Sequence, residues 1–331
     1  MEIITDIEHY RKEKHPKLVL ALGNFDGIHL GHLGILKKVS ERAREMGGTS
    51  AVFTFKEHPQ RVLRRKEGPA ILTSLVHKLH LLKQAVDLCF LIDFTIELSK
   101  KSPEEFVEKI LVESLGAKEI CLGFNARFGH GRSGDSRLMK QLAPKYGFTF
   151  HETPPFHIKG KVVSSSLIRS LIQEGNLKEA NELLGRPYSF FGTVVSGTGR
   201  GKGLGFPTAN LDAHSEALPP EGVYAVWINL WECQLVGEGT GTLELRERVI
   251  RSGLKGLLNY GRKPTFGAVS KPVPEVHILD FSEDLIDQTV EVVVGDRLRL
   301  EETFANQEAL KSQIRRDVEA GQKWFVKQKS N

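Results

Sequence analysis

The feature that most constrains the fold is an alternation of short apolar runs with longer amphipathic stretches between Lys17 and about Phe150. The apolar runs predict buried strands, and the amphipathic stretches carry apolar residues at helical spacing. Strands that alternate with helices form a parallel sheet covered by helices, because each parallel connection needs a crossover. The predicted strands are 18–23, 50–55, 88–93 and 119–123, and the predicted helices are 31–47, 74–85 and 103–116.

The pattern changes after two short helices predicted over 164–187. Short β-rich segments separated by Gly, Pro and polar turns follow, and they predict a small antiparallel barrel. A closing helix is predicted over 302–327. Its apolar stripe consists of Phe304, Leu310, Ile314 and Val318. A chain of 331 residues normally holds more than one domain, so we expect domains at 1–185 and 186–331.

Composition excludes several classes of protein. No apolar stretch approaches the roughly 18–20 residues of a membrane span, and residues 1–20 lack the pattern of a signal peptide. Cys89, Cys121 and Cys233 lie far apart, so neither a disulfide framework nor a zinc site is expected. The basic excess of the first half contains no block of like charges. We therefore expect a cytoplasmic protein with no nucleic-acid or membrane partner.

The strand at 18–23 leads into the loop G-N-F-D-G-I-H-L-G-H at 23–32. Glycines allow the backbone to turn tightly and approach a ligand, and a helix start offers unpaired N–H groups to an anion. His29 and His32 are three residues apart, so they face the same side of the helix and can both bind one phosphate chain. The alternative is a glycine turn with a capping Asp26 and two incidental histidines.

This loop resembles the signature of nucleotidyltransferases that carry H-x-G-H on a Rossmann-like sheet. The segment V-S-S-S-L-I-R at 163–169 resembles the I-S-S-T-x-I-R element of the same superfamily, although alone it reads as a serine cap with a surface arginine. The resemblance implies that two histidines stabilise charge at the α-phosphorus of ATP. The ATP-binding residues implied in this way are Gly23, Phe25, Asp26, His29, His32, Ser165, Ser166 and Arg169.

Further segments point to one type of transferase. The segments 53–59, 72–78, 102–113 and 123–129 resemble, in order and spacing, the adenylyltransferase module of bacterial bifunctional riboflavin kinase/FMN adenylyltransferases. The resemblance implies that His58, Asn125 and Arg127 bind the flavin. The chain has Asn125-Ala126 where the family usually has Asp-Phe, and Glu57-His58-Pro59 where it usually has Pro-His-Pro. A riboflavin kinase with a degenerate first module is therefore an alternative.

A second glycine-rich loop, G-T-G-R-G-K-G-L-G-F-P-T-A-N-L, occupies 197–211. It fits neither the Walker A nor the G-x-G-x-x-G spacing, and a flexible hairpin is the simplest interpretation. However, Arg200 and Lys202 lie among glycines whose N–H groups can wrap an anion. Thr208 and Asn210 supply neutral oxygen ligands suited to Mg²⁺.

This loop resembles the ATP and magnesium loop of riboflavin kinase, and four later segments follow in that family's order: 221–226, 258–266, 275–281 and 298–304. The resemblance implies Thr208 and Asn210 as metal ligands and Glu275 as catalytic base. Without it, Glu275 would read as a surface residue. The implied flavin contacts are Asn259 and Arg299. The implied ATP-binding residues are Gly197, Gly199, Arg200, Gly201, Lys202, Gly203 and Thr208.

The sequence thus predicts an α/β Rossmann-like nucleotidyltransferase domain followed by an antiparallel barrel with a C-terminal helix. The implied reactions convert riboflavin to FMN and FMN to FAD and pyrophosphate, with ATP as co-substrate and Mg²⁺ as cofactor. A homo-oligomer is compatible with the sequence. A flavin- or RNA-binding regulator is a weaker alternative, because it leaves the phosphate motifs unexplained. Residues 231–255, longer than the family's usual connection, receive no function.

Overall fold

The structure is a computed structural model that describes residues 1–63, 68–197, 205–237, 239, 241–262 and 272–328. The chain forms two compact units, and neither is a single stretch of sequence. The first unit comprises Met1–Leu167, Leu183–Gly185 and Gln234–Arg246. The second unit comprises Ile168–Glu182, Arg186–Cys233 and Glu247–Asn331.

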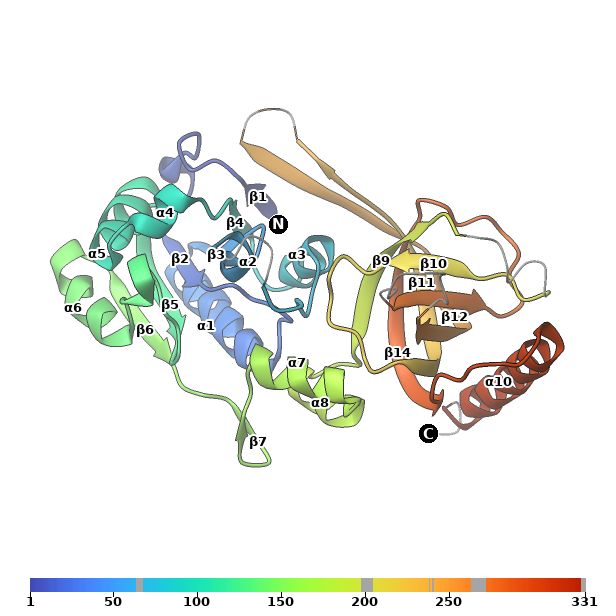
Figure 1. Ribbon diagram of the computed structural model, residues 1–331. Helices are drawn as coiled ribbons and strands as arrows, with labels where there is room; N and C mark the ends of the chain where they lie inside the picture. Colours follow the sequence, from blue (N-terminus) through green and yellow to red (C-terminus); the bar gives the residue numbers. More distant parts are fainter. Residues whose placement is uncertain (64–67, 198–204, 238, 240, 263–271, 329–331) are drawn as a thin grey trace. The chain divides into compact units, whose positions relative to one another are not determined.

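The first unit is built on a parallel sheet with strand order β1-β4-β3-β2-β5-β6 (Figure 1). Its strands are β1 (Glu2–Ile4), β2 (Leu18–Leu22), β3 (Thr49–Phe55), β4 (Leu88–Ile92), β5 (Ala117–Gly123) and β6 (Thr149–Thr153). In this order β3 lies on one side of β2 and β5 lies on the other, so the chain first adds strands on one side of β2 and later on the opposite side. The carboxyl end of β2 is therefore a topological switch point, where open α/β sheets bind ligands.

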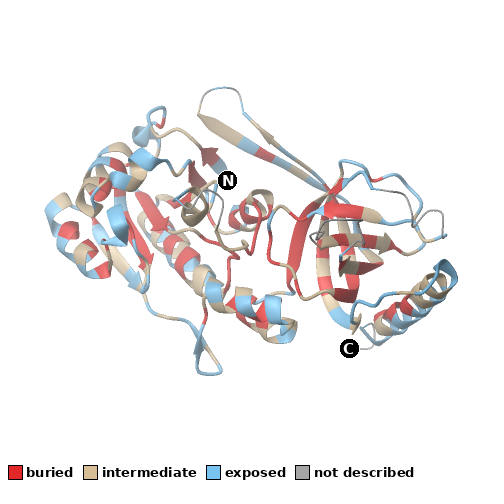
Figure 2. Ribbon diagram, in the orientation of Figure 1, coloured by how far each residue is buried: buried red, intermediate tan, exposed pale blue. Residues whose placement is uncertain are grey.

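Both faces of this sheet are covered, as the continuous apolar runs predicted. In β2, Leu18, Leu20 and Leu22 belong to one hydrophobic core, and Val19 and Ala21 belong to the other. Figure 2 shows β2 as buried along its whole length. The helices and the small hairpin are η1 (Lys12–Lys14), α1 (Leu30–Met46), α2 (Pro59–Leu63), α3 (Leu75–Lys83), α4 (Ile96–Lys100), α5 (Pro103–Glu105), η2 (Phe106–Ser114), η3 (His130–Arg132), α6 (Ser136–Tyr146), β7 (His157–Ile158), β8 (Lys161–Val162), α7 (Ser165–Glu174) and α8 (Leu177–Leu184).

One predicted helix differs in its hydrogen bonding. The residues expected to form a single helix over 103–116 form one α-helical turn, α5, and then the π-helical segment η2. The hydroxyl of Ser102 caps α5 by accepting a hydrogen bond from the N–H of Glu105 (3.1 Å). In η2 the N–H of Leu115 donates to the carbonyl of Ile110, five residues earlier.

Residues 234–246, part of the stretch for which no function was predicted, belong to the first unit. Leu243 pairs with Ile3 of β1 in antiparallel register, and the carbonyl of Gly241 accepts a hydrogen bond from Thr5 N (2.7 Å). Leu245 is buried in one of the cores of this unit. The segment therefore covers β1, which would otherwise be an open sheet edge.

The second unit is the predicted antiparallel barrel. In the described residues of this unit, six strands follow the order β11-β14-β9-β10-β13-β12, and pairing between β11 and β12 closes the barrel. They are β9 (Ser189–Val195), β10 (Ala209–Asp212), β11 (Gly222–Val236), β12 (Thr242–Gly261), β13 (Val273–Ile278) and β14 (Thr289–Arg299). Phe190, Tyr224 and Val292 are buried among its core side chains, because inward residues of a small barrel fill its interior.

The closing helix α10 (Gln307–Gln328) begins later than predicted. The side chain of Asn306 accepts a hydrogen bond from Ala309 N (2.9 Å), which fixes the start of the helix. Phe304 therefore precedes the helix and is not part of its apolar stripe. Phe325, near the other end of α10, is buried instead.

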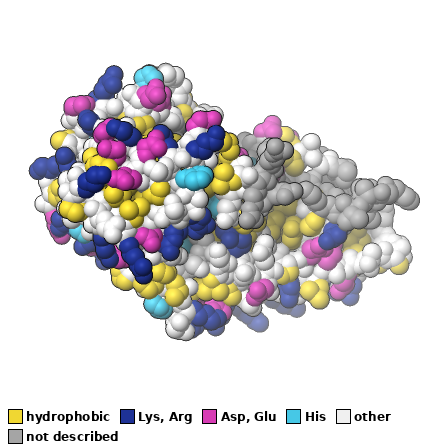
Figure 3. All heavy atoms as spheres, turned by 60° about the vertical axis from the view of Figure 1, so that its left-hand side comes forward, with side chains coloured by type: hydrophobic (Ala, Val, Ile, Leu, Met, Phe, Trp, Pro, Cys, Tyr) yellow, Lys and Arg dark blue, Asp and Glu magenta, His cyan; other side chains and the backbone are white. Residues whose placement is uncertain are grey.

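The surface carries both signs of charge. On the face shown in Figure 3, basic and acidic side chains of the first unit are interspersed. None of the helices in the described part of the chain combines the length and the apolar character that crossing a membrane requires.

Candidate active sites

The first candidate site begins in the loop that follows β2. Gly27 has φ +86°, and a Cβ there would lie 2.6 Å from Leu72 Cδ1, so only glycine fits. Gly27 N donates a hydrogen bond to the hydroxyl of Thr73 (3.1 Å). Phe25 also has a positive φ, of 50°. Non-glycine residues in this region concentrate at functional sites, where the surrounding structure holds the strain.

His29 and His32 come together at the start of α1. His29 is the N-cap residue, and its Nδ1 accepts a hydrogen bond from the backbone N–H of His32 (3.2 Å). The two imidazole rings stack with centroids 3.7 Å apart. A Cβ on Gly31 would lie 3.2 Å from the His29 ring, so the glycine of H-x-G-H gives this ring room. Because Nδ1 accepts, the proton of neutral His29 is on Nε2, which can donate to a phosphate.

His32 is held neutral in this arrangement. Burial, and then the neighbouring His29, lower the pKa of His32 well below its usual value. Its Nδ1 atom is buried and has no hydrogen-bond partner among the described residues. A buried polar atom without a partner costs free energy. A phosphate bound beside the ring would bring a negative charge that favours the protonated imidazole and so raises the pKa of His32.

Asp26 is not the cap of α1 that the alternative interpretation required. Its buried carboxylate accepts hydrogen bonds from the backbone N–H groups of Leu72 (2.7 Å) and Thr73 (3.2 Å). It therefore anchors the loop to the segment that precedes α3. Thr73 was missed by the sequence reasoning, although it lies in the segment 72–78 that carried the family resemblance.

The start of α7 is tied to the same loop. Ser164 caps α7 through its hydroxyl (3.3 Å), and the hydroxyl of Ser165 donates to the backbone carbonyl of Asp26 (2.9 Å). Ser166 follows in the first turn. Arg169 lies one turn further along α7 and belongs to the second unit.

The predicted ATP and flavin residues of the first unit follow neighbouring strands. Gly23 and Phe25 follow β2, but the Phe25 ring is buried and lies 5.2 Å from the His32 ring, so it supports that imidazole. His58 follows β3, and its Nδ1 accepts a hydrogen bond from Gln60 N (3.2 Å). The exposed Asn125 and Arg127 follow β5. Parallel strands bring all these segments to one sheet edge.

The second candidate site is a row of side chains across three strands of the barrel. Glu275 on β13 pairs in register with Asn210 on β10 and with Asn259 on β12. Residues directly opposite each other in antiparallel strands project from the same face, so this row joins three predicted site residues. A Cβ on Gly197 would lie 1.7 Å from Asn210 Nδ2, so the glycine is needed for this placement of Asn210.

His277 was not predicted as a site residue, although the quoted motif E-V-H-I-L-D-F contains it. It lies two residues after Glu275 and therefore on the same face of β13. Its Nδ1–H donates to the carbonyl of Pro207 (2.7 Å), which holds the segment in which the exposed Thr208 leads into β10.

Arg299 is already engaged within the second unit. Its guanidinium forms two hydrogen bonds with Asp317 of α10 (2.8 and 2.9 Å) and a third with the carbonyl of Leu300 (2.8 Å). Its predicted contact with the flavin stays a prediction.

The central part of the predicted ATP loop of the kinase lies outside the described residues. It comprises Gly199, Arg200, Gly201, Lys202 and Gly203.

Comparison with known proteins decides the family. Residues 11–167 match the family model of FAD synthetase, and residues 184–325 match that of riboflavin kinase. The bifunctional riboflavin kinase/FMN adenylyltransferase of Escherichia coli is 32% identical over 98% of this chain and 98% of its own. The chain belongs to the bifunctional riboflavin kinase/FMN adenylyltransferase family. The Bacillus subtilis member is 33% identical over 97% of both chains.

The fold of this family member is also found in a crystal structure. A chain named "Macrolide-efflux Protein" from Streptococcus pneumoniae superposes with a TM-score of 0.75 at 27% identity, over 98% of this chain and 100% of that chain. The two family matches confirm the predicted nucleotidyltransferase and riboflavin kinase domains. They favour the bifunctional interpretation over the kinase with a degenerate first module.

Proposed function

We propose that the two units catalyse consecutive reactions. The second unit phosphorylates riboflavin to FMN with ATP, and the first unit adenylates FMN to FAD with release of pyrophosphate. The observation that carries this proposal is that one chain holds both a stacked histidine pair after the glycine loop of β2 and a carboxylate between two asparagines in the barrel. Both belong to domains with matching family models.

In the first unit, adenylyl transfer needs positioning more than a protein nucleophile. A phosphate oxygen of FMN attacks the α-phosphorus of ATP, and the bond from that phosphorus to the bridging oxygen of pyrophosphate breaks. His29 and His32 donate to the phosphate oxygens and stabilise the developing charge. Gly23, Ser165 and Ser166 bind ATP. His58, Asn125 and Arg127 bind the flavin.

In the second unit, Glu275 acts as general base. Its carboxylate accepts the proton of the ribityl 5′-hydroxyl while that oxygen attacks the γ-phosphorus of ATP and ADP leaves. Asn259 and Arg299 bind the flavin, and the loop from Gly197 to Gly203 binds the phosphates.

The donor set of the barrel fits Mg²⁺. Thr208 offers a hydroxyl and Asn210 an amide oxygen, which are ligands of the type this ion takes. Asn210 is buried, and its position is restricted by Gly197. When bound, Mg²⁺ neutralises charge on the ATP phosphates.

Reciprocal variants test the two sites. Glu275→Gln removes the base but keeps the shape, and the double change His29→Ala and His32→Ala removes both imidazoles. Each protein receives riboflavin with Mg-ATP and, separately, FMN with Mg-ATP, and the flavins are separated by chromatography. We expect the first variant to lose FMN formation and keep FAD formation from FMN, and the second to do the reverse. Equal loss of both reactions in either variant would contradict separate sites.

The functional boundary that we propose lies between residues 185 and 186, with adenylyl transfer in 1–185 and the kinase in 186–331. The substrates are small molecules, namely riboflavin, FMN and ATP. The cytoplasm, where ATP is made and used, is the compartment that we propose.

A further inference from the structure

A buried ammonium group near the adenylyltransferase site has no role in the mechanism above. Lys78 lies on α3 and is only 6% exposed. Its Nζ donates a hydrogen bond to the backbone carbonyl of Phe55 at 2.6 Å. A buried lysine is unfavourable unless its charge is compensated, so this contact marks a position where the fold retains a charge at a cost.

The carbonyl that Lys78 holds lies at the start of the flavin segment, residues 56–58, which leads from β3 to His58. Phe55 is the last residue of β3. Lys56 N still donates to the carbonyl of Ile92 on β4 (3.1 Å), and the chain then leaves the sheet toward His58. Lys78 therefore fixes the point from which the segment with the proposed flavin residue departs.

Asp26 lies in the loop at 23–32, the ATP loop, and its negative charge acts on Lys78. Burial lowers the pKa of Lys78 to about 8, and the neighbouring Cys89 and then the charge of Asp26 oppose this shift. The same carboxylate holds the backbone of Leu72 and Thr73, just before the helix that carries Lys78. Helix α3 is thus anchored to the ATP loop at its beginning and to the end of β3 through Lys78.

We propose that Lys78 is a positioning residue for adenylyl transfer. It holds the flavin segment after β3 in place relative to the ATP loop. This inference rests on the proposed roles of His29, His32 and His58. Loss of the ammonium removes the hydrogen bond to the carbonyl of Phe55 but keeps the two hydrogen bonds from Leu72 N and Thr73 N to Asp26. The larger effect is therefore expected on the flavin side of the site.

The size of the effect follows from the sensitivity of transfer reactions to geometry. A displacement of about 1 Å between reacting groups can cost on the order of 100-fold in rate. Lys78→Met keeps the length and the apolar stem of the side chain but removes the donor. We expect kcat/KM for FMN to fall by about 10- to 100-fold, with a change in KM for ATP of less than about threefold.

The experiment measures FAD formation with FMN varied at saturating ATP, and then with ATP varied at saturating FMN. Riboflavin phosphorylation by the same preparation reports on the second unit and should not change. Lys83→Met, an exposed position on the same helix, is the matched control and should behave as wild type. Lys78→Arg restores a donor and should recover part of the loss.

A Lys78→Met protein with wild-type kcat/KM for FMN would overturn the inference. Equal losses on the FMN and ATP sides would also overturn it, because they would indicate a purely structural lysine. If Lys78→Met does not fold, the Arg variant decides: the FMN-specific loss must then appear in it in weaker form. Failure of the wild-type protein to form FAD would instead refute the proposed function itself.

Discussion

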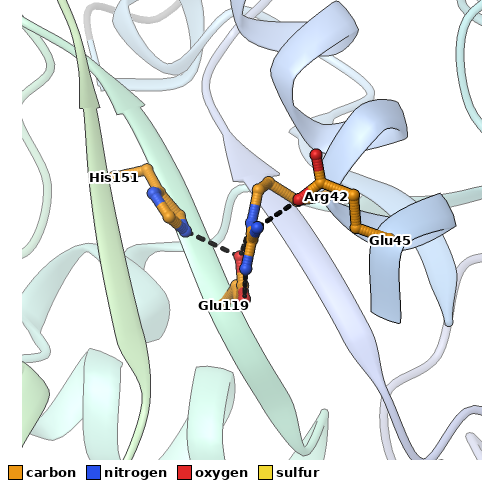
Figure 4. Close-up of polar contacts among 4 residues, drawn as sticks. All are labelled: Arg42, Glu45, Glu119 and His151. Atoms are coloured by element: carbon orange, nitrogen blue, oxygen red, sulfur yellow. Dashed lines mark hydrogen bonds and ion pairs between the residues drawn. The ribbon is translucent and has the colours of Figure 1, made fainter. Parts of the chain in front are cut away.

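The most direct test of the energetics concerns a carboxylate far from the proposed reacting groups. Glu119, near the amino end of β5, is 5% exposed. It accepts hydrogen bonds from Arg42 Nε (2.8 Å) and Nη2 (2.7 Å) and contacts His151 Nε2 at 2.6 Å. Figure 4 shows Arg42 of α1 and His151 of β6 converging on it, with Glu45 on the other side of Arg42. The cluster ties α1, β5 and β6 together.

The perturbation is Glu119→Gln, which keeps the shape and removes the charge. Removing one partner of a buried ion pair costs about 3–5 kcal/mol, because the other charge is left unpaired. Arg42 is 28% exposed and His151 is 22% exposed, so water can solvate both in the variant. We therefore expect a loss of about 2–3 kcal/mol in the free energy of unfolding of the first unit. At about 2–4 °C per kcal/mol, this loss lowers the midpoint of thermal unfolding of the first unit by roughly 4–12 °C.

The tryptophans make the assay specific. Trp227, Trp231 and Trp324 are the only tryptophans of the chain, and all lie in the second unit. Tryptophan fluorescence therefore follows the second unit, whereas residual FAD formation after heating follows the first. Glu119→Gln should lower the midpoint for loss of FAD formation and leave the fluorescence midpoint unchanged.

A matched control and the pH dependence sharpen the test. Glu45 also pairs with Arg42 but is 59% exposed, so Glu45→Gln should cost less than about 1 kcal/mol. The pKa of Glu119 is lowered, chiefly by the hydrogen bond from Arg42. Burial acts in the opposite direction but is the smaller effect. The stabilisation is therefore present above the usual carboxyl pKa and is lost as the pH falls through the lowered one. A variant as stable as wild type at pH 7 would refute this reasoning.

Three further predictions follow from single contacts. Gly197→Ala places a Cβ on the Asn210 amide and should lower kcat/KM of riboflavin phosphorylation about 10-fold or more; steady-state kinetics with unchanged FAD formation checks this. Because the pKa of His32 is lowered, ATP binding at the first site should take up protons and tighten as the pH falls; calorimetry in two buffers, compared with His32→Gln, should show the uptake in wild type alone. Leu245→Ala should destabilise the first unit by about 2–4 kcal/mol, and an unchanged midpoint for loss of FAD formation would argue against residues 234–246 being part of it.

Much of the fold could be predicted, because the spacing of apolar residues along the chain indicates which face of a strand or helix is buried. The apolar run of β2 and the amphipathic α1 needed no tertiary information. The start of α10 was predicted too early, because Phe304 fits the helical spacing although Asn306 caps the helix. Periodicity identifies a face, whereas the first residue of a helix depends on a cap.

The candidate sites divide in the same way. Two candidate phosphate-binding loops could be predicted from the sequence, since their glycines and polar residues lie close together in the chain and can act within one turn of backbone. The tertiary structure was needed to place Glu275 between Asn210 and Asn259, because that row depends on strand register. It also placed Lys78 on the carbonyl of Phe55 and residues 234–246 on the edge of the first sheet. A sequence pattern indicates that a polar group or a sheet edge needs a partner. The partner itself comes from a distant part of the chain, so only the folded structure identifies it.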